Sequence, residues 1–314
     1  MKNTKIHKKL LEWYDANGRH SLVWRESRNL YHIYLSEVML QQTQVSRVEE
    51  EYFPRFLEKF PTLERLSQAP LDDILALWSG LGYYRRAKNL HSCAQLTQGK
   101  LPKTLKELKK LPGIGDYTAS AICSFALEQS AICVVDTNIA RVLKRHFALL
   151  EVKDSLIWEY AQKFLNTKRA RAHNLALMDL GSMVCTPKNP SCLKCPLHES
   201  CQGKEEAELY TKVKKKEYIS MELYFGIYIK DKKIALEYSK DNMYKDMLVL
   251  PSVDPIEENF LGTFKHSYTK YKLDVKLYTI SEPSEDVVWI ALDAFNDAPI
   301  SSLTKKAQKF FYDF

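Results

Sequence analysis

Apolar residues recur at helical spacing through the first two thirds of the chain. The spacing is clearest over residues 6–14, 71–78 and 175–183, where positions three and four apart share one face. Proline and glycine interrupt the helical segments, as at Gly80–Gly82 and Pro112–Gly115. The pattern predicts a series of helices over residues 1–205 with no strand among them.

The last third of the chain alternates apolar and polar residues instead. Apolar residues occupy every second position from Ile219 to Ile229, which predicts a strand with one buried face. A turn at residues 231–233 leads to a partner strand, so a hairpin is predicted over Ile219–Tyr238. Residues 273–277 alternate likewise, and Leu303–Phe314 has helical spacing. Residues 219–314 are therefore predicted to form a small α+β domain, joined by a linker over residues 206–218.

Composition and charge agree with two folded domains in 314 residues, since 45% of the residues are hydrophobic and 27% are charged. Residues 1–205 hold 30 basic and 21 acidic side chains, a net +9, whereas residues 206–314 hold 16 and 18, a net −2. The positive part permits a polyanionic partner. No apolar run approaches the ~20 residues of a membrane helix, and Met1–Leu10 is followed by no apolar signal-peptide region. A cytoplasmic protein without membrane contact is expected.

Four of the seven cysteines lie within 17 residues, separated by six, two and five positions: Cys185, Cys192, Cys195 and Cys201. Four thiolates this close together can bind one metal centre. A zinc site is the alternative to an iron–sulfur cluster, although zinc sites usually contain two Cys-x-x-Cys pairs and this segment contains one. The remaining three lie among apolar neighbours and are expected to be core residues: Cys93, Cys123 and Cys133.

A glycine-containing turn, Leu111-Pro-Gly-Ile-Gly-Asp-Tyr117, separates two predicted helices. Gly113 and Gly115 allow a tight turn and the close approach of another backbone. The amides that begin the second helix can bind a phosphate without reading sequence. The segment is typical of a helix–hairpin–helix, and an ordinary helix N-terminus is the alternative.

Two carboxylates stand in apolar surroundings. Glu37 lies in the otherwise apolar segment Ile33–Leu40, where burial would raise its pKa and suit it to general-acid catalysis. A surface-facing glutamate is the alternative. Asp136 follows an apolar run and begins a predicted helix, and taken alone it has the pattern of an N-cap.

Together these motifs resemble the MutY-type adenine DNA glycosylases of the endonuclease III, or helix–hairpin–helix, superfamily. The resemblance covers residues 4–205 closely and rests on Ser36-Glu-Val-Met-Leu-Gln-Gln-Thr43, Leu77-Trp-Ser-Gly-Leu-Gly-Tyr-Tyr84, the glycine turn, Asp136 and the cysteine spacing. It implies a mostly α catalytic part with a 4Fe–4S cluster loop and a small α+β, Nudix-like C-terminal domain. A six-helix module would span about residues 22–126, and a cluster module would comprise residues 1–21 and 127–205.

The resemblance also implies a monofunctional glycosylase of base excision repair. Such an enzyme removes adenine mispaired with 8-oxoguanine or guanine after flipping the base out of the duplex. Glu37 would protonate the leaving adenine, Asp136 would stabilise the oxocarbenium-like sugar, and Glu37 or Asn138 would position the water. Tyr117 would lie beside the cation, at a position where bifunctional relatives carry a nucleophilic lysine. Ala140 replaces a second lysine of some members, so no Schiff base with the sugar is expected.

Other residues match binding positions of the same family. Gly113 and Gly115 would bind the DNA backbone, Gln42 would fill the gap in the base stack, and Tyr83 would wedge beside the opposite base. The adenine pocket would include Trp24, Arg25, Leu40 and Asp179, with plain core packing equally open for Trp24 and Leu40. The cluster ligands would be Cys185, Cys192, Cys195 and Cys201.

The C-terminal domain departs from the family pattern. MutY-type enzymes recognise 8-oxoguanine with a Phe-Ser-His loop, and Tyr268-Thr-Lys270 stands in its place here. Tyr268 can stack on a base and Thr269 can supply a hydroxyl, whereas Lys270 is a change of chemistry. Discrimination of 8-oxoguanine from guanine is therefore expected to be weaker or to use other residues. No Nudix catalytic motif is visible, so no pyrophosphatase activity is expected.

Two other functions stay open at the level of sequence. One is a bifunctional endonuclease III-like glycosylase and lyase, which Tyr117 disfavours. The other is a non-catalytic iron–sulfur DNA-binding protein, which Glu37 and Asp136 disfavour. The expected partners are double-stranded DNA containing adenine opposite 8-oxoguanine or guanine, together with replication or mismatch-repair proteins. The resemblance further implies a monomer associated with a bacterial nucleoid.

Overall fold

The computed structural model describes residues 2–211, 217–255 and 259–311. The chain divides into two compact units. Unit 1 comprises Met1–Phe53 and Lys100–Lys214, and unit 2 comprises Pro54–Gly99 and Lys215–Phe314. The six-helix segment expected over residues 22–126 therefore contributes to both units. Residues 212–216, in the expected linker, lie outside the described residues.

Unit 1 is helical, and its described part contains no strand before residue 205, as the periodicity predicts. The α-helices are α1 (Lys2–Asn17), α2 (Val23–Glu26), α3 (Leu30–Met39), α4 (Val45–Arg47), α9 (Leu105–Leu108), α10 (Asp116–Ala121), α11 (Thr137–His146), α12 (Asp154–Phe164) and α13 (Ala170–Met183). Two π-helical turns extend this set: η1 (Val48–Tyr52) and η2 (Ile122–Ala126). Short 3₁₀ turns complete it: η3 (Thr167–Arg169), η4 (Cys192–Lys194), η5 (His198–Ser200) and η6 (Ala207–Tyr210).

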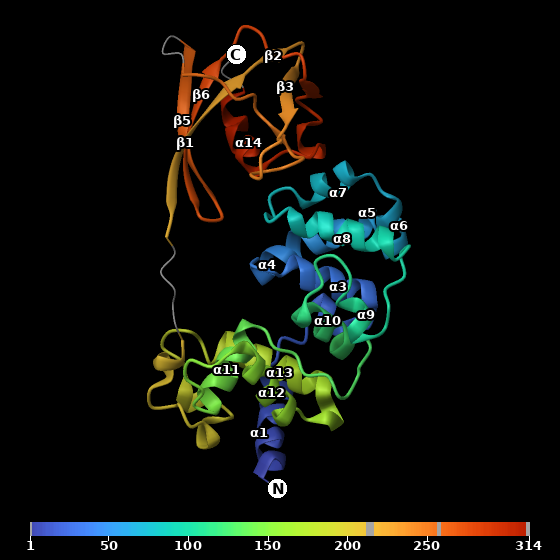
Figure 1. Cartoon of the computed structure of the whole chain (residues 1–314), viewed down its shortest axis with the longest axis vertical. Coiled ribbons are helices and arrows are strands. Elements are labelled where there is room, and N and C mark those ends of the chain that lie inside the picture. Colours follow the sequence, from blue (N-terminus) through green and yellow to red (C-terminus); the bar gives the residue numbers. More distant parts are fainter. Residues whose placement is uncertain (1, 212–216, 256–258, 312–314) are drawn as a thin grey trace. The chain divides into compact units, whose positions relative to one another are not determined.

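The core of unit 1 forms where apolar helix faces meet. Helix α13 packs against both α1 and α11, and Figure 1 shows these helices side by side with α12. Helix α3 begins at Asn29, whose side chain accepts hydrogen bonds from the backbone N–H groups of Tyr31 and His32. Eight of the ten residues of α3 are buried, Glu37 among them. A helix this apolar forces any carboxylate it carries into the protein interior.

The glycine turn has the backbone that its sequence predicts. Ile114 donates its N–H to the carbonyl of Leu111 at 3.2 Å, and Gly113 has a φ of 74°. Proline followed by a positive-φ glycine is the signature of a type II turn. Gly115 is the N-cap of α10, and a Cβ built on it would meet no atom within 4 Å. The backbone at this turn is therefore open to a ligand.

Unit 2 combines helices from the middle of the chain with the C-terminal domain. Its α-helices are α5 (Phe53–Lys59, beginning on the last residue of unit 1), α6 (Leu63–Gln68), α7 (Leu71–Trp78), α8 (Arg85–Leu96) and α14 (Ser302–Ala307). Among the described residues of unit 2 these helices are accompanied by the 3₁₀ turns η8 (Phe295–Asp297) and η9 (Gln308–Phe310). The predicted C-terminal helix is thus confirmed over its first turns only, and residues 312–314 lie outside the described residues.

In the described part of unit 2, seven strands form two sheets: β1 (Ile219–Ile227), β2 (Ile229–Lys230), β3 (Lys233–Tyr238), β4 (Leu248–Val249), β5 (Phe260–Tyr268), β6 (Tyr271–Thr279) and β7 (Val288–Ala291). The first sheet has the order β1–β6–β5, and in the second β3 pairs with β2, β4 and β7. Leu273, Val275 and Leu277 are almost fully buried, which confirms the alternation predicted for β6.

The predicted hairpin over Ile219–Tyr238 is wrong for most of its length. Only Ile229 and Lys230 pair with β3, through a turn in which Asp231 and Lys232 both have positive φ. The longer strand β1 runs parallel to β6, with Ile219 opposite Tyr271. Ile219 and Met221 are exposed, so the expected buried face begins only further along β1. A parallel partner fifty residues away leaves no mark on local periodicity.

No helix in the described part of the chain is both long and apolar enough to cross a bilayer. The three cysteines outside the cluster segment are buried, as predicted: Cys93, Cys123 and Cys133.

Candidate active site

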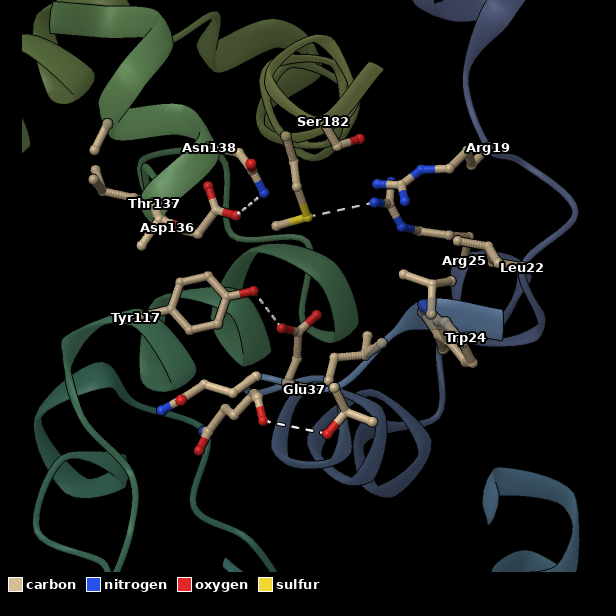
Figure 2. Close-up of a pocket in the computed structure, with 18 of the residues that line it drawn as sticks. Arg19, Leu22, Trp24, Arg25, Glu37, Tyr117, Asp136, Thr137, Asn138 and Ser182 are labelled. Atoms are coloured by element: carbon tan, nitrogen blue, oxygen red, sulfur yellow. Dashed lines mark hydrogen bonds between the residues drawn. The ribbon is translucent and has the colours of Figure 1, made fainter. Parts of the chain in front are cut away.

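A cavity of about 760 Å³ opens between the helices of unit 1. Its walls come from α2, α3, α10, α11, α12 and α13, so residues far apart in sequence meet around one space. Figure 2 shows Glu37 and Tyr117 on one side of this space, Asp136 and Asn138 on a second, and Arg25 on a third. A cavity of this size can hold a flipped nucleotide base.

Glu37 is the buried carboxyl group of this cavity, with only 6% of its surface exposed. Burial raises the pKa of Glu37 from 4.5 to about 7, because desolvation disfavours the charged form. The hydrogen bond from Tyr117 and the nearby Arg25 lower this pKa, and the nearby Asp136 raises it. Glu37 can thus hold a proton near neutral pH, and the surface-facing alternative is excluded.

Tyr117, in α10, donates its hydroxyl hydrogen to Oε2 of Glu37. Burial, together with the charges of Glu37 and Asp136, raises the pKa of Tyr117 well above its usual range. The phenol is therefore neutral and remains a hydrogen-bond donor to the carboxyl group. This contact fixes the direction in which Glu37 points, and Figure 2 shows it as a dashed line.

Asp136 is both an N-cap and a wall of the cavity. Its side chain accepts a hydrogen bond from the N–H of Ile139 at 2.6 Å, and Asn138 Nδ2 donates to Asp136 Oδ2 at 2.9 Å. Burial raises the pKa of Asp136, whereas these two hydrogen bonds oppose the rise by favouring the carboxylate. Asp136 thus does cap the helix, as the alternative interpretation predicts. Its carboxylate also faces the cavity.

Asp179 does not line the cavity, although the sequence placed it near the adenine pocket. It is fully buried behind the wall and pairs with Arg19 Nη2 at 2.6 Å and with Arg25 Nη2 at 3.2 Å. Arg25 itself lines the cavity, as do Trp24 and Leu40. Asp179 therefore holds two guanidinium groups in position, and Arg19 is a cavity residue that sequence reasoning missed.

Arg141 is a second residue that sequence reasoning missed. Its guanidinium donates to Asn138 Oδ1 at 2.9 Å, to the carbonyl of Gly181 at 2.5 Å and to the carbonyl of Cys185 at 2.7 Å. Asn138 in turn donates to Asp136. A continuous hydrogen-bond path thus joins the carboxylate to the start of the cysteine segment. Its position one helical turn after Asn138 was the available signal.

The four cysteines of the cluster segment line one cavity in unit 1, together with apolar residues: Val142, Leu180, Val184 and Leu197. Arg145, only 1% exposed, donates to Cys185 Sγ at 3.3 Å and to the carbonyls of Thr186 and Ala207 at 2.7 Å. Within the described ranges no group of three His, Cys, Asp or Glu side chains is placed to hold a metal ion. The four thiols thus line a shared cavity beside the positively charged guanidinium group of Arg145.

The predicted DNA-contacting residues have unusual backbones. Gln42, which lines the cavity of unit 1, is exposed with a φ of 59°. Tyr83, in unit 2, has a φ of 49° and is 37% exposed, with the guanidinium of Arg86 5.5 Å from its ring centre. Non-glycine residues rarely adopt such φ values, and they cluster at functional sites.

The residues predicted to read the opposite base lie at a hairpin tip in unit 2. Strands β5 and β6 meet there, with Tyr268 paired to Tyr271 across a two-residue turn of Thr269 and Lys270. Thr269 has a φ of 51° and is exposed with Lys270, whereas Tyr268 is half-buried. The tip thus presents both the threonine and the lysine side chain to solvent.

Comparisons with known proteins agree with this geometry. The model of a family described as HhH-GPD superfamily base excision DNA repair protein matches residues 35–167. The solved structure of a thermostable thymine-DNA glycosylase superposes with a TM-score of 0.60 at 28% identity, covering 65% of this chain and 99% of that one. The fold and the cavity are therefore those of a DNA repair protein of the helix–hairpin–helix class.

Curated relatives narrow this class. The adenine DNA glycosylase of Buchnera aphidicola subsp. Baizongia pistaciae is 34% identical over 280 residues, which are 85% of this chain and 79% of that protein. Its counterpart in Buchnera aphidicola subsp. Schizaphis graminum is 39% identical over 223 residues, 68% of this chain and 64% of that protein. The chain belongs to the adenine DNA glycosylase family, which confirms the resemblance seen in the motifs. It spans less than two thirds of the length of the second relative.

Proposed function

We propose that this chain is a monofunctional DNA glycosylase that removes adenine mispaired with 8-oxoguanine or guanine in DNA. The observation that carries the proposal is the protonatable Glu37 in a cavity that also holds Asp136. Hydrolysis of a glycosidic bond needs an acid for the leaving group and a negative charge beside the developing sugar cation. The two carboxyl groups supply one of each, because their surroundings differ.

Glu37 would donate its proton to a ring nitrogen of the flipped adenine, and the C–N bond would then break. Asp136, held by Ile139 and Asn138, would stabilise the oxocarbenium-like sugar. Water positioned by Glu37 or Asn138 would add to the sugar carbon. Tyr117 carries no amine, so no covalent Schiff base forms and the product keeps an intact strand. Arg25, held by Asp179, would face the base.

The cysteine segment supports a 4Fe–4S cluster held by Cys185, Cys192, Cys195 and Cys201. The four thiols share one cavity, and Arg145 offsets negative charge on Cys185. The spacing of the four cysteines favours a cluster over a zinc ion, because the segment contains only one Cys-x-x-Cys pair. When bound, the cluster would cross-link the loop. Because four thiolates would hold it, it would offer no open coordination position for the reaction.

The DNA contacts that we propose follow from the same site. The hairpin turn with Gly113 and Gly115 would bind the backbone, while Gln42 and Tyr83 would insert beside the flipped base. In unit 2 the C-terminal domain would be a Nudix-like reader of 8-oxoguanine, with Tyr268 and Thr269 at the contact. Its two small sheets and short terminal helix support that assignment.

One assay tests this function. Duplexes containing adenine opposite 8-oxoguanine or opposite guanine are incubated with the protein, and strands are analysed with and without hot alkali. Strand cleavage only after alkali is the expected result. Cleavage without alkali would indicate a bifunctional lyase, and tight binding without base release would indicate a non-catalytic DNA-binding protein.

A further inference from the structure

We propose that Tyr244 is a positioning residue that couples the hairpin tip at Tyr268 to the Tyr83 loop within unit 2. The inference rests on the proposed function, in which Tyr268 reads the base opposite adenine and Tyr83 wedges beside it. Residues 83 and 268 are far apart in sequence, and Tyr244 touches the neighbours of both.

Tyr244 lies directly against the reading tip. Its ring centre is 4.6 Å from that of Tyr268, with the two planes tilted by 52°. Its hydroxyl lies 2.7 Å from Nε2 of His266, two residues before Tyr268 on β5. Tyr244 and Tyr268 also line one cavity of about 930 Å³ in unit 2. A change in the position of the Tyr268 ring must therefore be accommodated by Tyr244.

The other side of Tyr244 meets the loop that carries Tyr83. The ring centres of Tyr244 and Tyr84 are 6.1 Å apart. Ser302, at the start of α14, lies 3.1 Å from the Tyr244 hydroxyl and also hydrogen-bonds the Tyr84 hydroxyl. Tyr84 directly follows Tyr83 in the chain. The contacts of Tyr244 therefore reach the residue next to Tyr83, the proposed wedge residue.

The same loop is anchored to the C-terminal domain at other points. Ser79 donates its hydroxyl hydrogen to the carbonyl of Ile300 at 2.6 Å, and Lys88 pairs with Asp246 at 2.6 Å. These anchors fix both ends of the segment between α7 and α8. The positive-φ backbone of Tyr83 lies between these anchors.

Strain is present at both ends of the contact. Tyr244 has a φ of 60° and Tyr83 a φ of 49°, values that bulky residues keep only where the surroundings enforce them. Tyr244 is only 3% exposed, so little of its side chain is accessible to solvent. Packed, strained groups shift between discrete arrangements rather than deforming smoothly, which suits them to transmit a contact.

A double-mutant cycle on the full chain tests the coupling directly. Adenine release in single turnover is measured for Tyr83→Ala, Tyr268→Ala and the double variant, on duplexes with 8-oxoguanine or guanine opposite adenine. When Tyr244 is present, the fold-loss of rate in the double variant should differ by about 5-fold or more from the product of the losses in the two single variants. In a Tyr244→Leu background they should become additive within about 2-fold, whereas Tyr244→Phe, which keeps the ring contacts but loses the hydrogen bond to Ser302, should retain part of the coupling.

Two further variants guard against a purely structural explanation. Tyr278→Leu removes an equally buried tyrosine from β6 and should leave the non-additivity intact. Ser302→Ala, which removes the shared hydroxyl, should weaken the coupling by at least about 2-fold, and it serves if Tyr244→Leu does not fold. Thermal unfolding confirms that each variant is folded.

Additive losses in the parent chain, or equal non-additivity in the Tyr244→Leu background, would overturn the proposal. No adenine release by the parent chain from either duplex would instead contradict the proposed function. The two failures are therefore distinguishable.

Discussion

The catalytic cavity of unit 1 and the tyrosine-rich cavity of unit 2 have similar volumes, but different groups are buried at their centres. The first, of about 760 Å³, places three carboxyl groups (Glu37, Asp136 and Asp154) and two guanidinium groups around one space. The second, of about 930 Å³, has its central contacts made by uncharged phenol rings, with Tyr244 and Tyr268 side by side. Volume alone therefore does not distinguish a reaction site from a recognition site.

The difference lies in what burial does to each set of side chains. In unit 1, desolvation moves the Glu37 pKa toward neutrality, and Asp179 keeps Arg19 and Arg25 from repelling each other. In unit 2, burial keeps Tyr244 neutral by raising its pKa. The first cavity therefore holds a carboxyl group that can exchange a proton near pH 7, whereas the Tyr244 phenol of the second stays a neutral hydrogen-bonding group.

The largest expected effect comes from removing the proton donor. Glu37→Gln keeps the shape of the side chain but cannot deliver a proton, so single-turnover adenine release should fall by at least about 100-fold. Binding to the same duplex, measured by fluorescence anisotropy, should change little. Glu199→Gln, at an exposed glutamate, is the matched control. Retained activity in Glu37→Gln would place the acid elsewhere.

The pH dependence of the reaction should follow the Glu37 pKa. Because burial raises that pKa to about 7, the acid form is present below pH 7 and is lost above it. The single-turnover rate should therefore fall about 10-fold per pH unit in the alkaline range. A rate that stays constant from pH 6 to about pH 9 would contradict the assignment of Glu37 as the acid.

Tyr117→Phe should shift that profile. The Tyr117 hydroxyl lowers the Glu37 pKa by donating to the carboxylate, so its loss should raise the pKa and move the alkaline limb to higher pH. The measurement is the same pH series, with Tyr160→Phe as the control. A limb that moves to lower pH would show that Tyr117 stabilises the protonated acid instead.

The smallest effect is expected in unit 2. Tyr244→Phe removes hydrogen bonds to His266 and Ser302, which should lower the free energy of unfolding by about 1–2 kcal/mol in urea titrations. The alkaline limb at pH 7 should not move, because no ionisation in the catalytic cavity depends on that phenol. A shift of the alkaline limb of the pH–rate profile would show that the Tyr244 hydroxyl affects ionisation in the catalytic cavity.

Local signals in the sequence predicted much of this structure. Helical spacing located α1, α7 and α13, and the turn with Gly113 followed from proline and glycine chemistry. The burial of Glu37 could be inferred because every face of its helix carries apolar residues. These features depend on residues within a few turns of one another.

The features that sequence reasoning missed join distant segments. The pairing of β1 with β6 crosses about fifty residues, and Asp179 reaches Arg19 across 160. Arg141 was overlooked because its acceptors are mostly backbone carbonyls, which leave no trace in side-chain identity. A single sequence carries no periodic signal for contacts between distant segments or for contacts with backbone carbonyls.

The interleaved boundaries of the two units have a consequence for the synthesis of the chain. The segment Pro54–Gly99 leaves the ribosome more than a hundred residues before its partner Lys215–Phe314. At typical translation rates the delay is on the order of 10 s, during which the surface around Ser79 and Tyr84 has no C-terminal domain to cover it. The two segments of unit 1 are likewise complete while Pro54–Gly99, which lies between them in the chain, still lacks its partner Lys215–Phe314. Nascent chains of this protein should therefore need a chaperone for longer than their length alone would indicate.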